Sequence, residues 1–125
     1  MKLLLDTHVV LWSLGDPAQL SDEARTRIAD PANAVGVSAA SAWEIAIKSG
    51  TGKLKFNAGL VEALAQADFI SLPITIEHAL AAGNLPPHHR DPFDRMLIAQ
   101  AMLDGWTLVT RDSLMPAYGV PLLLA

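Results

Sequence analysis

Five short runs that are apolar or β-branched along their whole length constrain the fold of this chain most. Strands with one face exposed to water alternate apolar and polar residues, whereas strands covered by helices on both faces do not. The runs therefore predict buried strands of a parallel sheet. They are Leu3 to Leu5, Ala34 to Val37, Phe69 to Ile74, Thr107 to Thr110 and Val120 to Leu124.

Helical stretches fill the intervals between these runs. Pro92 to Asp104 is the clearest helix, because Asp91 can cap it, proline suits the first helical position and Gly105 suits the end. The other expected helices run from a Ser21 cap to Asp30, from Ala39 to Ser49 with Gly50 as the stop, from Ala58 to Ala67 and from Ile76 to Ala82.

This alternation of strands and helices predicts a three-layer α/β/α fold with a central parallel sheet of four to five strands. A chain of 125 residues, 51% of them hydrophobic, suits one domain over residues 1–125. Gly36 lies inside the second expected strand, where a glycine weakens the prediction. The chain has no cysteine, which excludes disulfides and thiolate metal sites and fits the reducing cytoplasm. No apolar run approaches the roughly 20 residues of a membrane span, so no membrane association is expected.

The net charge of −4 is unusual for a nucleic-acid-binding protein, which normally carries a basic surface. The charge comes from 9 basic and 13 acidic residues. If four acids form one metal site, the remaining acids and bases are equal in number, and bound cations reverse the local field. Net charge therefore does not exclude a nuclease.

Four acidic residues are expected at one edge of the sheet. Asp6 ends the first strand, Glu44 lies in the helix after the second, and Asp112 follows the fourth. Asp94 lies in the first turn of the helix that begins at Pro92. Ligands of open α/β sheets bind outside the carboxyl ends of the strands, where these residues fall.

Helix capping is the alternative explanation for each acid taken singly. Asp6 and Asp112 can cap the turns that follow them, Ser41-x-x-Glu44 fits a capping box, and Asp94 lies in a first turn. Caps need no common edge, whereas a metal site does, so the set as a whole favours a metal site.

Mg²⁺ and Mn²⁺ prefer oxygen ligands of this kind. Two such ions about 3.5–4 Å apart can activate a water and stabilise the leaving oxygen of a phosphodiester. The chain has neither G-x-x-x-x-G-K nor G-x-G-x-x-G, so no phosphate-binding loop competes with this interpretation.

Four segments in order resemble the PIN-domain nucleases, and more closely the VapC-like toxins of type II bacterial toxin–antitoxin pairs. They are LLLDTHVVLW, SAASAWEIAIKSGTGKL, HRDPFDRMLIAQA and LVTRD. The resemblance covers nearly the whole chain. It implies a parallel sheet flanked by helices, Mg²⁺- or Mn²⁺-dependent endonuclease activity on RNA, a homodimer and a separate antitoxin that covers the site.

The family's acids fall on Asp6 in LLLDTH, Glu44 in SAWEI, Asp94 in DPFDR and the more variable Asp112 in TRD. The resemblance implies that the first three bind the principal metal ion and that Asp112 supports it or a second ion. All four are the expected catalytic and metal-binding residues. The hydroxyls of Thr7, Ser38 and Thr110 are candidates for orienting these carboxylates.

Several other polar residues have two interpretations. His88 and His89 suggest a transition-metal site, but a solvated loop after two prolines is favoured. Lys48 suits a helical pair with Glu44. Alternatively it belongs to a basic strip for the RNA backbone, together with Lys53, Lys55, Arg90, Arg95 and Arg111. Trp12, Trp43 and Trp106 have apolar neighbours and are expected in the core or an interface.

Three other functions compete with this one, and the residues argue against the first two. A receiver-like signalling domain needs an acidic pair after the first strand, a phosphorylatable Asp after the third and a late Lys. This chain has only the single Asp6 after the first strand, Pro73 to Thr75 where the phosphorylatable Asp would lie, and no lysine beyond Lys55. These differences argue against a receiver domain. A haloacid-dehalogenase-like phosphatase needs Asp-x-Asp where this chain has DTH. The third alternative is a catalytically inactive module that binds metal or RNA.

Overall fold

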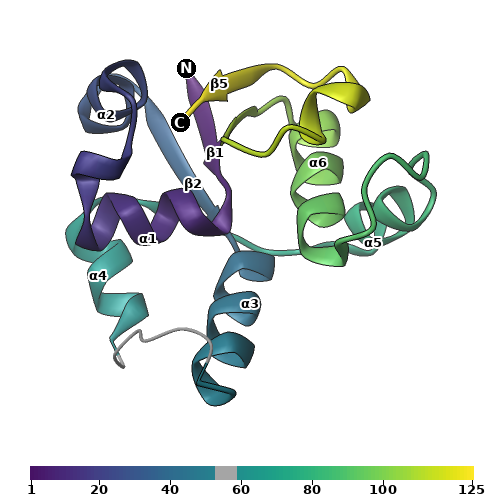
Figure 1. Cartoon of the computed structure of the whole chain (residues 1–125), viewed down its shortest axis with the longest axis horizontal. Coiled ribbons are helices and arrows are strands. Elements are labelled where there is room, and N and C mark those ends of the chain that lie inside the picture. Colours follow the sequence, from purple (N-terminus) through teal and green to yellow (C-terminus); the bar gives the residue numbers. More distant parts are fainter. Residues whose placement is uncertain (53–58) are drawn as a thin grey trace.

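The computed structural model describes residues 1–52 and 59–125, and its centre is a parallel five-stranded sheet (Figure 1). Neighbouring strands follow the order β3-β2-β1-β4-β5. Leu5 is paired with Val37 on one side and with Val109 on the other, so the three central strands end at the same level. The strands are β1 (Lys2–Leu5), β2 (Ala34–Ser38), β3 (Ile70–Leu72), β4 (Thr107–Thr110) and β5 (Leu122–Leu124).

Helices cover both faces of the sheet, which confirms the predicted three layers. In Figure 1, α1, α2 and α4 lie on one side of the sheet and α5 and α6 on the other, whereas α3 extends from the end of β2. The helices within the described residues are α1 (Thr7–Gly15), α2 (Asp22–Ala29), α3 (Ala39–Gly50), α4 (Leu60–Gln66), α5 (Ile76–Gly83) and α6 (Pro92–Asp104), with 3₁₀ turns at Pro17–Gln19 and Met115–Tyr118.

The core consists of two apolar clusters, one on each face of the sheet. Leu3 and Leu5 of β1 pack into the cluster beneath α1 and α2, while Leu4 packs against Leu97 and Ile98 of α6. All three leucines are fully buried because successive side chains of a strand point to opposite faces. The continuous apolar runs in the sequence therefore reflect burial on both sides.

The helix ends follow the predicted signals in most places. Ser21 caps α2, Asp91 caps α6, and Gly105 ends α6 with a φ of 73°. Gly50 was expected just after α3, but it is the last residue of this helix and Thr51 is the C-cap. Helix α4 begins at Leu60, and the predicted start at Ala58 lies outside the described residues. Within residues 1–52 and 59–125, every helix is too short or too polar to cross a bilayer.

Gly36 belongs to β2 because the sheet has no room there for a side chain. A Cβ atom at this position would lie 2.9 Å from Leu72 Cδ1 and 3.0 Å from two ring carbons of Trp106. The glycine that weakened the sequence prediction is therefore a site of close approach between the strand and the indole ring of Trp106.

Candidate active site

All four predicted acids line one cavity of about 390 Å³ at the carboxyl edge of the sheet. Asp6 lies between β1 and α1, and Asp112 follows β4. Glu44 projects from α3 and Asp94 from the first turn of α6. Elements far apart in the sequence thus bring the acids together. Asp91 and five further residues complete the lining: Thr7, His8, Trp12, Lys48 and Arg111.

Asp6 is a helix cap and a cavity residue at once. Its Oδ1 accepts a hydrogen bond from the backbone N–H of Val9 at 3.0 Å, and its Oδ2 accepts one from the Thr110 hydroxyl at 2.5 Å. Burial raises the pKa of Asp6 above its ordinary value, although these two hydrogen bonds act in the opposite direction. Capping therefore does not compete with a functional role, because it fixes the orientation of the carboxylate.

Glu44 is buried and does not form the predicted capping box. Helix α3 is instead capped by Ser38, whose hydroxyl accepts from the Ala40 N–H at 3.0 Å. Glu44 Oε1 accepts from the Thr7 hydroxyl at 2.5 Å, and Oε2 lies 2.5 Å from Lys48 Nζ. The hydrogen bond to Glu44 raises the pKa of Lys48. Of the three predicted orienting hydroxyls, Thr7 and Thr110 contact carboxylates and Ser38 caps a helix.

Asp94 is the carboxylate most affected by its surroundings. Burial raises its pKa to about 7, and the negative charges of Asp91, Asp6 and Glu44 add to this effect. The neighbouring Asp91 is used as a cap, since its Oδ1 accepts from the backbone N–H groups of Phe93 and Asp94 at 2.8 and 3.2 Å. This division of roles leaves the side chain of Asp94 facing the cavity.

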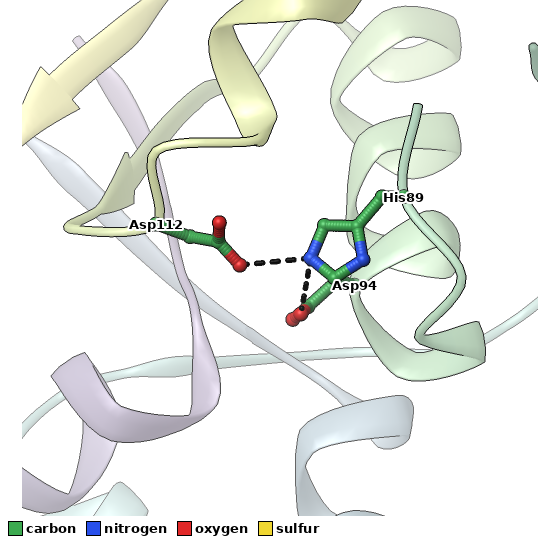
Figure 2. Close-up of side chains that lie close together, drawn as sticks. All are labelled: His89, Asp94 and Asp112. Atoms are coloured by element: carbon green, nitrogen blue, oxygen red, sulfur yellow. Dashed lines mark hydrogen bonds and ion pairs between the residues drawn. The ribbon is translucent and has the colours of Figure 1, made fainter. Parts of the chain in front are cut away.

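His89 is buried, so the predicted solvated loop is wrong at this residue. Figure 2 shows its ring between Asp94 and Asp112, with Nε2 lying 3.0 and 2.8 Å from an oxygen of each. Its Nδ1 accepts from the backbone N–H of Asp91 at 3.1 Å. Burial lowers the pKa of His89, but Asp112 and Asp94 outweigh it and raise the pKa above its ordinary value.

The loop around His89 is fastened by two side chains. Tyr118 accepts a hydrogen bond from the His89 backbone N–H and donates one to the Pro86 carbonyl, both at 2.8 Å. Arg95 donates to the carbonyls of Ala82, Leu85, Pro86 and His89. Arg95 therefore has a structural role here and does not contribute to the predicted basic strip. The sequence contains one hint of the role of His89, namely that it lies two residues before the helix cap Asp91. Histidines at such positions are also common in ordinary loops, so this hint did not predict its burial.

Asp112 is held by backbone and side-chain donors. Its Oδ1 accepts from the Leu114 N–H at 2.8 Å, and its own N–H donates to the Thr110 hydroxyl at 3.0 Å. Although burial acts to raise it, the hydrogen bonds from Leu114 and His89 hold the pKa of Asp112 below its ordinary value. Among the described residues, only His89, Asp94 and Asp112 form a group of three side chains whose ligand atoms all lie within 4.8 Å of one another.

Arg111 and the tryptophans differ in part from expectation. The Arg111 guanidinium lies 4.4 Å from the ring centre of Trp12 and donates to the carbonyls of Gln19 and Ala125. Trp106 is buried in the core. Trp43 is 63% exposed and touches Phe93 edge-on, so of the two expected positions, core or interface, only the interface remains a prediction for it. The predicted positions of Lys53 and Lys55 in the basic strip lie outside the described residues.

Comparisons of the sequence and of the fold with known proteins agree with one another. The model of the PIN domain matches residues 3–120. Ribonuclease VapC22 of Mycobacterium tuberculosis is 34% identical over 113 residues, which are 88% of this chain and 86% of the relative. The fold resembles VapBC2 of Rickettsia felis bound to promoter DNA, with a TM-score of 0.72, 15% identity and 98% of each chain covered. FitAcB of Neisseria gonorrhoeae gives a TM-score of 0.61 and 22% identity, with 98% and 96% of the chains covered.

Proposed function

The chain belongs to the PIN-domain family, and on that premise we propose that it is a metal-dependent endoribonuclease, the toxin of a toxin–antitoxin pair. The observation that carries this proposal is the meeting of Asp6, Glu44, Asp94 and Asp112 in one cavity. The relative named Ribonuclease VapC22 supports RNA as the substrate. The VapBC complexes of the same fold support a toxin with a protein partner.

The donor set fits a hard divalent cation. The four acids supply oxygen atoms, and Asp6 and Glu44 are buried, so water screens their charges poorly. Burial raises the pKa values of Asp6 and Asp94, and the negative charges of neighbouring acids add to this effect. Mg²⁺ or Mn²⁺ would relieve this repulsion. Asp6, Glu44 and Asp94 would hold the ion, with Asp112 in support.

The chain's own residues prepare the site. Thr7 and Thr110 hold the carboxylates of Glu44 and Asp6 in fixed orientations, so little rearrangement is needed when a ligand binds. Lys48 places a positive charge beside Glu44 at the cavity wall, where it can also contact an RNA phosphate. A divalent ion bound there supplies Lewis-acid activation of water and neutralises charge on the phosphodiester.

The partners follow from the same assignment. RNA is the proposed substrate, and the cytoplasm is the proposed place of action. A cognate antitoxin would cover the cavity, and arginine is the side chain best suited to pair with clustered carboxylates. A homodimer is proposed from the family resemblance, and exposed apolar residues such as Leu80, Met102 and Leu103 give such an interface material to bury.

The test is cleavage of mixed structured RNAs by antitoxin-free protein with Mg²⁺, Mn²⁺ or EDTA. Wild type is compared with Asp94→Asn and with Asp22→Asn, whose exposed aspartate also lies in the first turn of a helix but faces another surface. We expect metal-dependent cleavage by wild type and Asp22→Asn, and its loss in Asp94→Asn. RNA cleavage by Asp94→Asn at the wild-type rate would refute the assignment of this cavity as the active site. Metal binding without cleavage of any RNA would favour the inactive module.

A further inference from the structure

The imidazole of His89 lies between the carboxylates of Asp94 and Asp112. Nε2 lies 2.8 Å from Asp112 Oδ2 and 3.0 Å from Asp94 Oδ2 (Figure 2). We propose that the Nε2–H group of His89 takes the place of a second cation between Asp94 and Asp112, so that the cavity holds a single divalent ion. This inference rests on the proposed metal site and specifies how many ions it takes.

The partner of Nδ1 shows which nitrogen of His89 carries the proton. The backbone N–H of Asp91 points at Nδ1 from 3.1 Å, so Nδ1 must be an acceptor. The proton of the neutral ring then lies on Nε2, which donates to Asp112 at 2.8 Å and lies 3.0 Å from Asp94 Oδ2. A histidine that ligates a metal shows the opposite arrangement, because its second nitrogen donates to a carboxylate or carbonyl. His89 is therefore a hydrogen-bond donor to Asp112 with its N–H group close to Asp94, and not a metal ligand beside these acids.

The ring is also fixed in place. Its Nδ1 is held by Asp91, its backbone N–H by the Tyr118 hydroxyl at 2.8 Å, and its backbone carbonyl by Arg95 at 3.1 Å. The side chain is buried, so it cannot turn away without breaking these contacts or exposing their partners. An ion entering between Asp94 and Asp112 would have to displace an anchored group.

Asp112 has its oxygens engaged by protein donors. Oδ1 accepts from the Leu114 N–H and Oδ2 from His89 Nε2, both at 2.8 Å. The inference therefore makes Asp112 a carboxylate that positions His89, and it makes His89 a positioning residue for Asp94. The ion itself would be bound by Asp6, Glu44 and Asp94.

The first experiment counts Mn²⁺ bound per full-length chain by equilibrium dialysis with electron paramagnetic resonance detection. We expect one tightly bound ion in wild type and two in His89→Ala, where the pair of carboxylates becomes free. His89→Gln retains an N–H donor and should stay at one. His88→Ala is the matched control, because His88 is the exposed neighbour, and it should also stay at one.

The outcomes separate this inference from the proposed function. Two ions in wild type, or one ion in a folded His89→Ala, would overturn the role of His89 and leave the nuclease proposal standing. No bound ion in wild type would refute the metal site and this inference together. If His89→Ala does not fold, ¹⁵N spectra of wild type decide. The Nε2 proton should remain when Mg²⁺ or Zn²⁺ is added, and its loss would make His89 a ligand.

Discussion

Replacing Asp94 by asparagine should make the metal-free protein more stable at neutral pH. The substitution keeps the shape of the side chain and an oxygen that can lie beside His89 Nε2, but it removes a charge that burial and neighbouring acids oppose. Most single substitutions destabilise a protein by about 1 kcal/mol. If Asp94→Asn loses activity but gains stability, the aspartate lowers the stability of the fold and is present because the activity requires it.

The size of the gain follows from the pKa of Asp94, which is about 7 in the folded chain against an ordinary 3.8. Each unit of pKa difference corresponds to about 1.4 kcal/mol, so ionised Asp94 lowers the unfolding free energy by at most about 4 kcal/mol. Asparagine also loses favourable interactions of the carboxylate, and we expect a net gain of about 2 kcal/mol at pH 8.

The pH dependence has a definite sign. Below pH 3.8 the carboxyl is protonated in both states and contributes nothing. As the pH rises towards about 7, the folded state keeps a proton that the unfolded state has released, so the stability of wild type falls relative to Asp94→Asn. Above about 7 the difference is constant.

Urea unfolding in EDTA at several pH values from 4 to 8 measures this difference. Asp22→Asn is the control, because that exposed carboxylate lies in a first helical turn away from the cavity. Saturating Mg²⁺ should stabilise wild type and reverse the order, since only wild type retains the full ligand set. A variant that is less stable than wild type at pH 8, or a difference independent of pH, would refute the reasoning.

Three further predictions follow from the same structure. Gly36→Ala should lower the unfolding free energy by about 1–3 kcal/mol in urea, because its Cβ would meet neighbours at 2.9–3.0 Å. Gly83→Ala is the control, because a Cβ there would meet open space, so this variant should not lower the unfolding free energy. Equal losses of stability in the two variants would contradict this account. Thr110→Val removes the hydroxyl that donates to Asp6 and should weaken Mn²⁺ binding about tenfold in calorimetry; unchanged affinity would argue against this orienting role. Wild-type Mn²⁺ affinity should fall by up to about tenfold per pH unit below about 7, as Asp94 takes up a proton; a flat profile from pH 5.5 to 8 would be inconsistent with its raised pKa.

The sheet and most helices could be predicted because burial on both faces leaves a local pattern. Leu3 to Leu5 is apolar at every position since the chain packs helices on both sides of β1. The edge strands were predicted too long: β3 covers Ile70–Leu72 within the expected Phe69 to Ile74. Strand ends depend on pairing with β2, and a single run of sequence does not contain that information.

Side-chain partners were predicted less well because they come from distant segments. Glu44 suited a capping box with Ser41, yet its hydrogen bonds go to Thr7 and Lys48. His89 lies in a polar, proline-preceded segment, and its backbone N–H is bound by the hydroxyl of Tyr118, 29 residues later. The four acids were expected at one edge because the topology of a parallel sheet determines where strands end. The interactions that tune each acid required the folded structure.

The most direct test of the proposed site is removal and return of the metal during cleavage of end-labelled RNA. Protein stripped with EDTA is assayed before and after Mg²⁺ or Mn²⁺ is added, alongside the double variant Asp6→Asn, Asp94→Asn. We predict that cleavage stops in EDTA, returns with added metal in wild type and does not return in the folded double variant. Cleavage that persists in EDTA, or that the double variant carries out at the wild-type rate, would contradict the assignment of this carboxylate cavity as the active site.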